Sequence, residues 1–277
     1  QIMKLIIILL STVFIYPNEG DLYTFIVQHN LEDPISKYRT ETMLDFAFGS
    51  YQNSMNSDYK VTEKYLGEKD GFLLIEKTTT DMVATTVTFG EMVVNNEALD
   101  VVGIPYTVFV DSCGDIDDVQ TEHLQFEELI RSMEMDMGST TNYIYPFGEN
   151  AVDIKLGDSW SFNDDSMLFY PGDGEFENFM KIQCLFTLDK VKEKKGTLVA
   201  YISSIYNISV EEMLYQQSGK FFEGNMAGSG KGKIRYDLNR GKKMLEKMDI
   251  GMKWNVTFED KHLVEMMNIN TKTKWKK

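Results

Sequence analysis

Residues 244–258 read MLEKMDIGMKWNVTF, and this run predicts the architecture of the chain. From Met244 to Phe258 every second residue is apolar except Glu246, and most residues between them are polar. Side chains that alternate in this way lie on opposite faces of a β-strand, one covered and one in water. At about 3.3 Å per residue the run predicts one strand of about 50 Å, or two strands joined by a bulge near Gly251. Strands of that length favour a large, curved antiparallel sheet.

Other segments show the same alternation. Residues 229–238 and 262–275 flank the first run, and the three together predict a C-terminal meander. Two hairpins are predicted upstream, because turns that contain glycine separate alternating runs. The paired runs are residues 178–190 with 196–208, and residues 59–66 with 71–79.

Helical spacing is confined to two places. One helix is predicted over residues 120–137, where five apolar residues share a face and Gly138 provides a C-cap. These five are Leu124, Leu129, Ile130, Met133 and Met137. A second, short helix is predicted over residues 209–217, which begin like a capping box.

A short phrase occurs twice. Gly20-Asp21-Leu22-Tyr23-Thr24-Phe25 recurs as Gly157-Asp158-Ser159-Trp160-Ser161-Phe162. A second pair of segments, residues 106–114 and 232–241, shares a strand that ends in an Asp turn closed by Gly. A duplication explains both pairs, and so does chance convergence of turn sequences. We expect a mainly β (α+β) fold with large curved antiparallel sheets from two similar β-rich halves and one clear helix near 120–137. The halves are residues 20–145, with the helix, and residues 146–277.

The N-terminal residues resemble an export signal. Met3-Lys4 precedes an apolar run from Leu5 to Tyr16, too short to span a bilayer and typical of a signal-peptide core. The run predicts a signal peptide over residues 1–19, cleaved within residues 16–20, and export to the periplasm or the extracellular space. The alternative is a first strand or core helix. No later run reaches membrane length, so no transmembrane segment is predicted.

The net charge of the chain limits the classes of partner that it is expected to bind. The formal net charge of -15 repels phosphate backbones, so no nucleic-acid partner is expected. The charge is uneven, because residues 220–277 hold 14 Lys/Arg against 7 Asp/Glu. This asymmetry indicates two complementary faces of one molecule, or a basic end that meets an acidic partner or surface. Expected partners are a hydrophobic or lipid-like ligand and a protein of the envelope.

Residues with reactive side chains form no recognisable catalytic pattern. His29, His123 and His262 are scattered, and the acidic residues around 111–118 are interpreted as turn carboxylates. The run Gly228-Ser229-Gly230-Lys231-Gly232-Lys233 lacks the hydroxyl of a phosphate loop and enters a strand. Cys113 and Cys184 form one disulfide or, as we prefer, are two separate buried thiols. We therefore predict a non-enzymatic protein with no catalytic residue, metal or cofactor.

Methionine is abundant, at 17 residues. Met is flexible and polarisable, so it suits adaptable binding surfaces, and it also fills irregular cores. We predict that apolar residues of the C-terminal strands bind an apolar or amphiphilic ligand on a concave sheet face. These residues are Met244, Met248, Ile250, Met252, Trp254 and Met267. The alternative is a structural or protein-interaction module of the envelope whose apolar faces are core.

Three segments carry a family resemblance. They are residues 152–160, which end in Gly157-Asp158-Ser159-Trp160, the glycine-rich entry at 228–232 into Tyr236-Asp237, and the Met-rich alternating strands. Over residues 20–275 the chain resembles an uncharacterised family of exported bacterial β-proteins, a domain of unknown function. The resemblance implies an exported β-sheet protein and supplies no catalytic residue. The long strands also resemble, more loosely, the half-barrel carriers that ferry lipoproteins across the periplasm.

Overall fold

The computed structural model describes residues 21–27, 34–48, 51–88, 91–94, 99–112, 114–131, 134, 147, 151–168, 178–217, 220–258 and 261–276. Its strands are β1 (Leu22–Ile26), β2 (Ile35–Phe48), β3 (Tyr51–Lys69), β4 (Phe72–Thr88), β5 (Glu91–Val94), β6 (Pro105–Val110), β7 (Ile116–Gln120), β8 (Ala151–Lys155), β9 (Ser159–Leu168), β10 (Asn178–Lys194), β11 (Thr197–Gln217), β12 (Lys220–Asp237), β13 (Lys242–Phe258) and β14 (Lys261–Trp275). A 3-10 turn, Leu124–Phe126, leads into the helix α1 (Glu127–Arg131). The predicted signal peptide lies outside the described residues.

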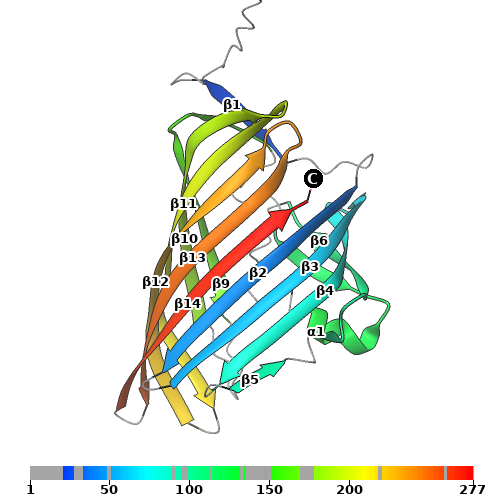
Figure 1. Cartoon of the computed structure of the whole chain (residues 1–277). Coiled ribbons are helices and arrows are strands. Elements are labelled where there is room, and N and C mark those ends of the chain that lie inside the picture. Colours follow the sequence, from blue (N-terminus) through cyan, green and yellow to red (C-terminus); the bar gives the residue numbers. More distant parts are fainter. Residues whose placement is uncertain are drawn as a thin grey trace, which may run out of the picture.

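One antiparallel sheet of twelve strands dominates the molecule (Figure 1). Its strands follow the order β7-β6-β4-β3-β2-β14-β13-β12-β11-β10-β9, and β5 pairs with β4. The sheet curves strongly, and no ladder among the described residues joins β7 to β9, so it is not closed. β1 and β8 form a separate two-stranded sheet. The prediction of a mainly β fold with large curved antiparallel sheets and one helix is confirmed. Within the described residues, no helix has the length and apolar character needed to cross a membrane.

The predicted meander and hairpins are confirmed. β12, β13 and β14 pair in sequence, as do β10 with β11 and β3 with β4. β13 is one continuous strand, because its pairing with β14 runs without a register shift through Gly251. The first alternative for residues 244–258 is therefore the correct one.

The helix predictions need correction. α1 covers only part of the predicted helix at 120–137, because Gln120 still belongs to β7, and residues 135–137 lie outside the described residues. Leu124, counted on the apolar face, is 74% exposed.

The predicted helix at 209–217 is wrong, since β11 continues to Gln217. The residues that resemble a capping box lie at a bulge between Val210 and Met213, which turns both of these side chains into the core.

The two predicted halves share one sheet. β14 pairs with β2, which places strands from residues 34–88 beside strands from residues 178–275. The two copies of the repeated phrase lie in different sheets, since the first starts β1 and the second starts β9 at the edge of the large sheet. At the second copy Gly157 has φ of +87° and its N–H donates to the Leu188 carbonyl over 2.9 Å. Division of the chain into halves stays a prediction.

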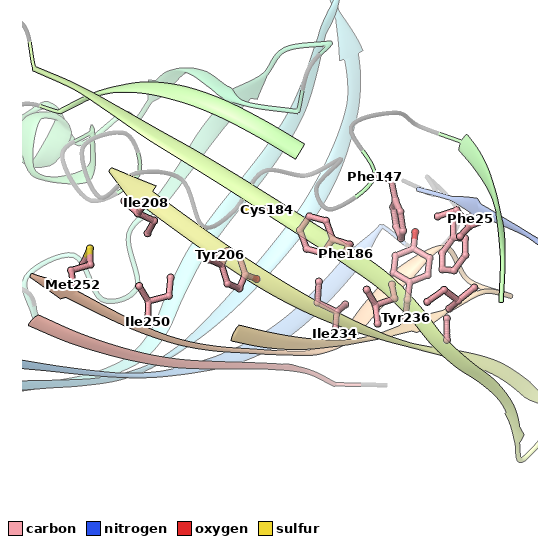
Figure 2. Packing of buried hydrophobic residues seen from close by; sticks show 14 of the residues in the cluster. Phe25, Phe147, Cys184, Phe186, Tyr206, Ile208, Ile234, Tyr236, Ile250 and Met252 are labelled. Carbon is pink, nitrogen blue, oxygen red and sulfur yellow. The ribbon is translucent and has the colours of Figure 1, made fainter. Parts of the chain in front are cut away.

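The main apolar core lies on the inner face of the sheet, the face that carries Phe186 and Ile234. β1 and β8 cover this face with Phe25 and Ile154, and Phe147 packs between them and the sheet (Figure 2). Aromatic rings meet at close range: Phe147 lies 4.8 Å from Phe25 and 5.1 Å from Tyr236, centroid to centroid. Cys184 is buried in this core, and Cys113 lies outside the described residues, so the relation of the two cysteines stays a prediction.

Glycines on the inner face of β12 let neighbouring side chains lie against its backbone. A Cβ at Gly230 would lie 2.5 Å from the Asp249 carbonyl and 2.6 Å from the Ile250 Cγ1. A Cβ at Gly228 would lie 2.5 Å from the Met252 side chain. The Gly228–Lys233 run is thus a strand whose inward positions must be small.

A second, smaller apolar core lies between β4, β6, β7 and α1. Ile75, Val108 and Val119 fill it, and Ile130 of α1 is 1% exposed against them. The Arg131 guanidinium anchors the helix by donating to the Asp118 carboxylate over 2.8 Å. This core sits at the β7 edge of the sheet, away from the strands that carry the predicted ligand residues.

Candidate functional site

A cleft of about 200 Å³ opens on the sheet where β13, β14, β2 and β3 lie side by side. Cross-strand pairing builds it, because Met267 lies opposite Phe46, Phe46 lies opposite Asn53, and Trp254 lies opposite Glu265. Side chains that pair across an antiparallel ladder share one face, which makes these five neighbours on the inner face. The cleft is lined by Phe46, Ala47, Asn53, Trp254, Glu265, Met266 and Met267.

Polar groups of Asn53, Glu265 and Trp254 lie among the apolar walls. The Asn53 Oδ1 is buried and accepts no hydrogen bond within the described part of the chain. A buried acceptor left unpaired costs about 1–3 kcal/mol, so this oxygen favours any donor that enters the cleft. Burial also raises the pKa of the half-buried Glu265 carboxyl. The cleft therefore combines apolar walls with a hydrogen-bond acceptor and an acidic group, the composition typical of a site for a small amphiphile.

The six residues predicted to bind ligand lie in different places in the structure. Trp254 and Met267 line the cleft. Ile250 and Met252 are buried in the main core, at 3% and 8% exposure. Met248 is partly buried against that core, and Met244 is partly buried at the start of β13. The ligand-binding role of the set stays a prediction.

Sequence reasoning missed five lining residues, which are Phe46, Ala47, Asn53, Glu265 and Met266. Glu265 carried a signal, since it is an acid at an inward position of the alternating run through Leu263, Met267 and Ile269. Asn53 carried none, because the predicted strand began at residue 59 whereas β3 begins at Tyr51.

A buried polar cluster lies on the inner face near the β4 side. The Lys77 Nζ, 2% exposed, lies 2.7 Å from the Glu134 carboxylate. The Tyr106 hydroxyl donates to the other Glu134 oxygen over 2.6 Å. Thr40 and Thr273 hydroxyls, 3.0 Å apart, extend the polar interior into β2 and β14. Because both Glu134 oxygens are engaged, the cluster holds the segment at residue 134 against the sheet.

The pKa values in this cluster follow from burial and charge. Burial and the neighbouring Glu134 charge raise the pKa of Tyr106 well above its usual value. Burial alone lowers the pKa of Lys77, but attraction by Glu134 and Glu63 outweighs it, so the pKa is raised. Lys77 therefore stays charged and Tyr106 stays neutral near pH 7, the states that their hydrogen bonds require.

Of the carboxylates interpreted as turn residues, Asp111 and Asp115 lie at a turn, whereas Asp117 and Asp118 belong to β7. The backbone N–H of Asp115 donates to the Asp111 carboxylate over 3.0 Å, and Asp118 accepts from Arg131. His262 contacts the Thr257 hydroxyl over 2.9 Å, and His29 lies outside the described residues. Among the residues that the structure describes, no three His, Cys, Asp or Glu side chains gather as a metal site would require.

The chain matches no protein-family model and no curated protein. One similar solved structure is the β domain of the Bordetella autotransporter Brka, which is 9% identical. The match covers 87% of this chain and 99% of that chain, with a TM-score of 0.25. A TM-score that low does not establish a shared fold.

Proposed function

We propose that this protein is an exported, non-enzymatic binding protein that holds an apolar or amphiphilic ligand in the cleft on the inner face of β13, β14, β2 and β3. The observation that carries the proposal is the buried, unpaired Asn53 Oδ1 beside the apolar side chains of Phe46, Trp254 and Met267. A ligand with a donor group and an apolar body satisfies both parts of this lining. Export is supported by the apolar run that follows Met3-Lys4.

The dimensions of the cleft limit how a ligand binds. About 200 Å³ is smaller than the usual site for a drug-sized molecule, so the cleft receives one end of a ligand. Partly buried Ile269, Met248 and Leu44 continue the inner face beyond it. Apolar contact there adds about 25 cal/mol per Å² of surface removed from water.

The alternative function is a structural or protein-interaction module. One observation favours it: Ile250 and Met252, both predicted to touch ligand, are buried in the core. If the cleft serves only to pack against a partner, small amphiphiles will not saturate it.

Ligand titration separates the two functions. Delipidated protein titrated with a fluorescent fatty amine and a fluorescent fatty acid is expected to bind at least one of them saturably. Met267→Asp places a charge in the cleft and is expected to weaken binding about tenfold or more. Met43→Asp, on the outer face of β2 and 41% exposed, is the matched control and should bind as the wild type does. Absence of saturable binding, or an equal loss in both variants, contradicts the proposal.

A further inference from the structure

The outer face of the sheet carries directly opposed cations. Lys233 of β12 pairs with Lys247 of β13, which pairs with Lys272 of β14. All three side chains point to the same face, and like charges in directly opposite positions repel. On the neighbouring strands Arg39 likewise lies opposite Lys60, but there nearby carboxylates form ion pairs with both cations.

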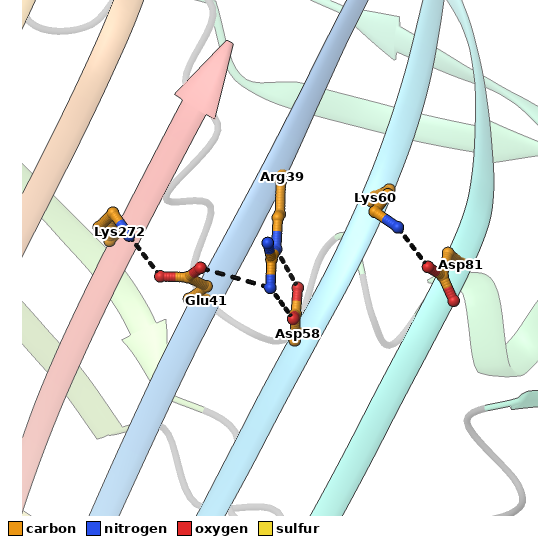
Figure 3. Close-up of polar contacts among 6 residues, drawn as sticks. All are labelled: Arg39, Glu41, Asp58, Lys60, Asp81 and Lys272. Atoms are coloured by element: carbon orange, nitrogen blue, oxygen red, sulfur yellow. Dashed lines mark hydrogen bonds and ion pairs between the residues drawn. The ribbon is translucent and has the colours of Figure 1, made fainter. Parts of the chain in front are cut away.

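Those neighbouring strands, β2 to β4, form a useful contrast (Figure 3). There the Lys60 Nζ lies 2.5 Å from the Asp81 carboxylate. The Arg39 guanidinium donates hydrogen bonds to both oxygens of the Asp58 carboxylate. Lys272, at the boundary, is 2.5 Å from Glu41. Lys233, Lys247 and Arg235 form no ion pair with a carboxylate in the described part of the chain, whereas Lys231 lies opposite Asp249. Cations without an ion pair also occur elsewhere, as Lys64 and Lys69 of β3 do, but on β12 and β13 they lie directly opposite each other.

Three cationic side chains surround Tyr201 on this face. The Lys190 and Lys194 ammonium groups lie 5.1 and 5.5 Å from its ring centroid, and the Arg235 guanidinium lies 5.5 Å away. Three cations around one partly buried ring create a local positive potential. The pKa of the Tyr201 hydroxyl is accordingly lowered, by the hydrogen bond from Lys194 and by the other nearby charges.

Exposed aliphatic side chains lie among these cations. Leu185 of β10 pairs with Ile205 of β11, and Ile205 pairs with Lys231 of β12. Leu185 is 45% exposed and Ile205 is 53% exposed. Lysine and arginine beside exposed aliphatic and tyrosine side chains match the boundary between lipid headgroups and acyl chains, where both kinds of group gain. A soluble polyanion would interact with the cations but would gain nothing from the exposed aliphatic side chains.

Two features act against attraction to an anionic surface. Asp249 lies opposite Lys231, and Asp189 accepts from the Ser203 hydroxyl on the same face. The whole chain has a net charge of -15. At physiological salt, however, charges more than about 8 Å from the contact are largely screened, so the local cations govern docking.

We propose that the outer face of β10–β13, carried by Lys233, Arg235 and Lys247 with Leu185 and Ile205, docks on the surface of an anionic lipid bilayer. This surface lies on the opposite side of the sheet from the ligand cleft. The proposal does not depend on ligand binding, which is measured in the absence of membrane.

The test is sedimentation with vesicles of phosphatidylcholine mixed with phosphatidylglycerol, and with vesicles of phosphatidylcholine alone. Binding is expected only to the anionic vesicles and is expected to weaken as salt rises. The double variant Lys233→Glu/Lys247→Glu should lower the partition coefficient about tenfold or more. The control Lys64→Glu/Lys69→Glu makes the same change in net charge on β3. Its partition coefficient should stay within about twofold of the wild-type value, because net charge alone has only a small effect. All four positions are exposed, so the fold is retained, which circular dichroism verifies.

A second variant distinguishes a bilayer from a soluble polyanion. Leu185→Ser/Ile205→Ser should weaken vesicle binding severalfold while leaving weak contact with long-chain polyphosphate unchanged. Binding to polyphosphate without binding to anionic vesicles would overturn the bilayer assignment. Equal binding to neutral and anionic vesicles, or equal losses in the Lys233/Lys247 and Lys64/Lys69 variants, would overturn it as well.

Discussion

The inner face of the sheet differs sharply between β10–β13 and the adjoining strands β14, β2 and β3. Over β10–β13, Phe186 and Ile234 are 0% and 1% exposed, because β1, β8 and Phe147 cover them. Over β14 and β2, Met267 and Phe46 are only partly buried and border a cleft. Both regions have the same alternation of apolar and polar residues. Alternation therefore determines which face is apolar, whereas covering elements determine whether that face becomes core or cleft.

The two regions also differ in how their strands approach each other. Glycines at inward positions of β12 admit Ile250 and Met252 against the backbone, which fills the space over β10–β13. The adjoining strands instead carry paired threonine hydroxyls, such as Thr40 with Thr273. The Thr40 side chain is buried, so this pair belongs to the polar interior and not to the cleft.

The largest expected effect comes from truncating matched aromatic residues in the two regions. Phe186→Ala should lower the free energy of unfolding by about 3–5 kcal/mol, because it leaves a cavity beside the Trp160 and Tyr206 rings. Phe46→Ala should lower it by about 1 kcal/mol or less, since the site is already partly open. Urea unfolding measures both, and equal losses would show that the two regions are packed alike.

Breaking the buried ion pair should rank next. Lys77→Met leaves the Glu134 carboxylate buried without its cation and should destabilise by about 3 kcal/mol. The double variant Lys77→Met/Glu134→Leu removes the uncompensated charge and should recover most of the loss. No recovery in the double variant would mean that the pair contributes specific stability beyond charge compensation.

Backbone crowding offers a third comparison, between the two faces of one ladder. Gly230→Ala should destabilise by about 1–3 kcal/mol, because its Cβ meets the Asp249 carbonyl and the Ile250 side chain. Gly251→Ala adds a Cβ 3.2 Å from the Asn268 Oδ1 on the exposed face and should cost about 0.5 kcal/mol or less. Thermal unfolding of the two variants measures the difference, which should vanish if the inner face were loosely packed.

The smallest expected effect is the dependence of the free energy of unfolding on pH. Burial raises the pKa of Tyr106, Tyr59 and Tyr236, so these hydroxyls stay neutral in the folded protein above the pH at which they ionise when unfolded. Their stabilising effect is present below about pH 10 and declines as pH rises above it. Stability followed by urea unfolding from pH 8 upward should fall, and Tyr106→Phe should fall less steeply. Identical slopes for the two proteins would show that Tyr106 is not among the groups responsible.

Much of the sheet was predictable because the alternation of apolar and polar residues that marks a strand is a local sequence pattern. Alternation over residues 244–258 predicted β13, and glycine turns predicted the β3–β4 and β10–β11 hairpins. The helices were predicted less well. The helix over residues 209–217 was predicted from a capping-box-like start, but pairing with β12, which no local pattern shows, keeps these residues in a bulged strand.

The candidate cleft was predictable only in part. Trp254 and Met267 were predicted because they belong to a Met-rich alternating run. Phe46 and Asn53 lie more than 200 residues away in the chain and reach the cleft through the pairing of β14 with β2 and of β2 with β3. That pairing joins segments near the two ends of the described chain, and no local pattern encodes it.

Local patterning alone thus specified strands β3, β4 and β10 to β14 and the apolar face of each, because these depend on neighbours a few residues apart. Tertiary structure alone decided that Ile250 and Met252 are core while Trp254 and Met267 border a cleft. It also placed Lys233 opposite Lys247, which made a basic outer face in an acidic protein. The physical reason is that burial and cross-strand charge are properties of pairs of segments, and the partners are chosen only when the whole sheet assembles.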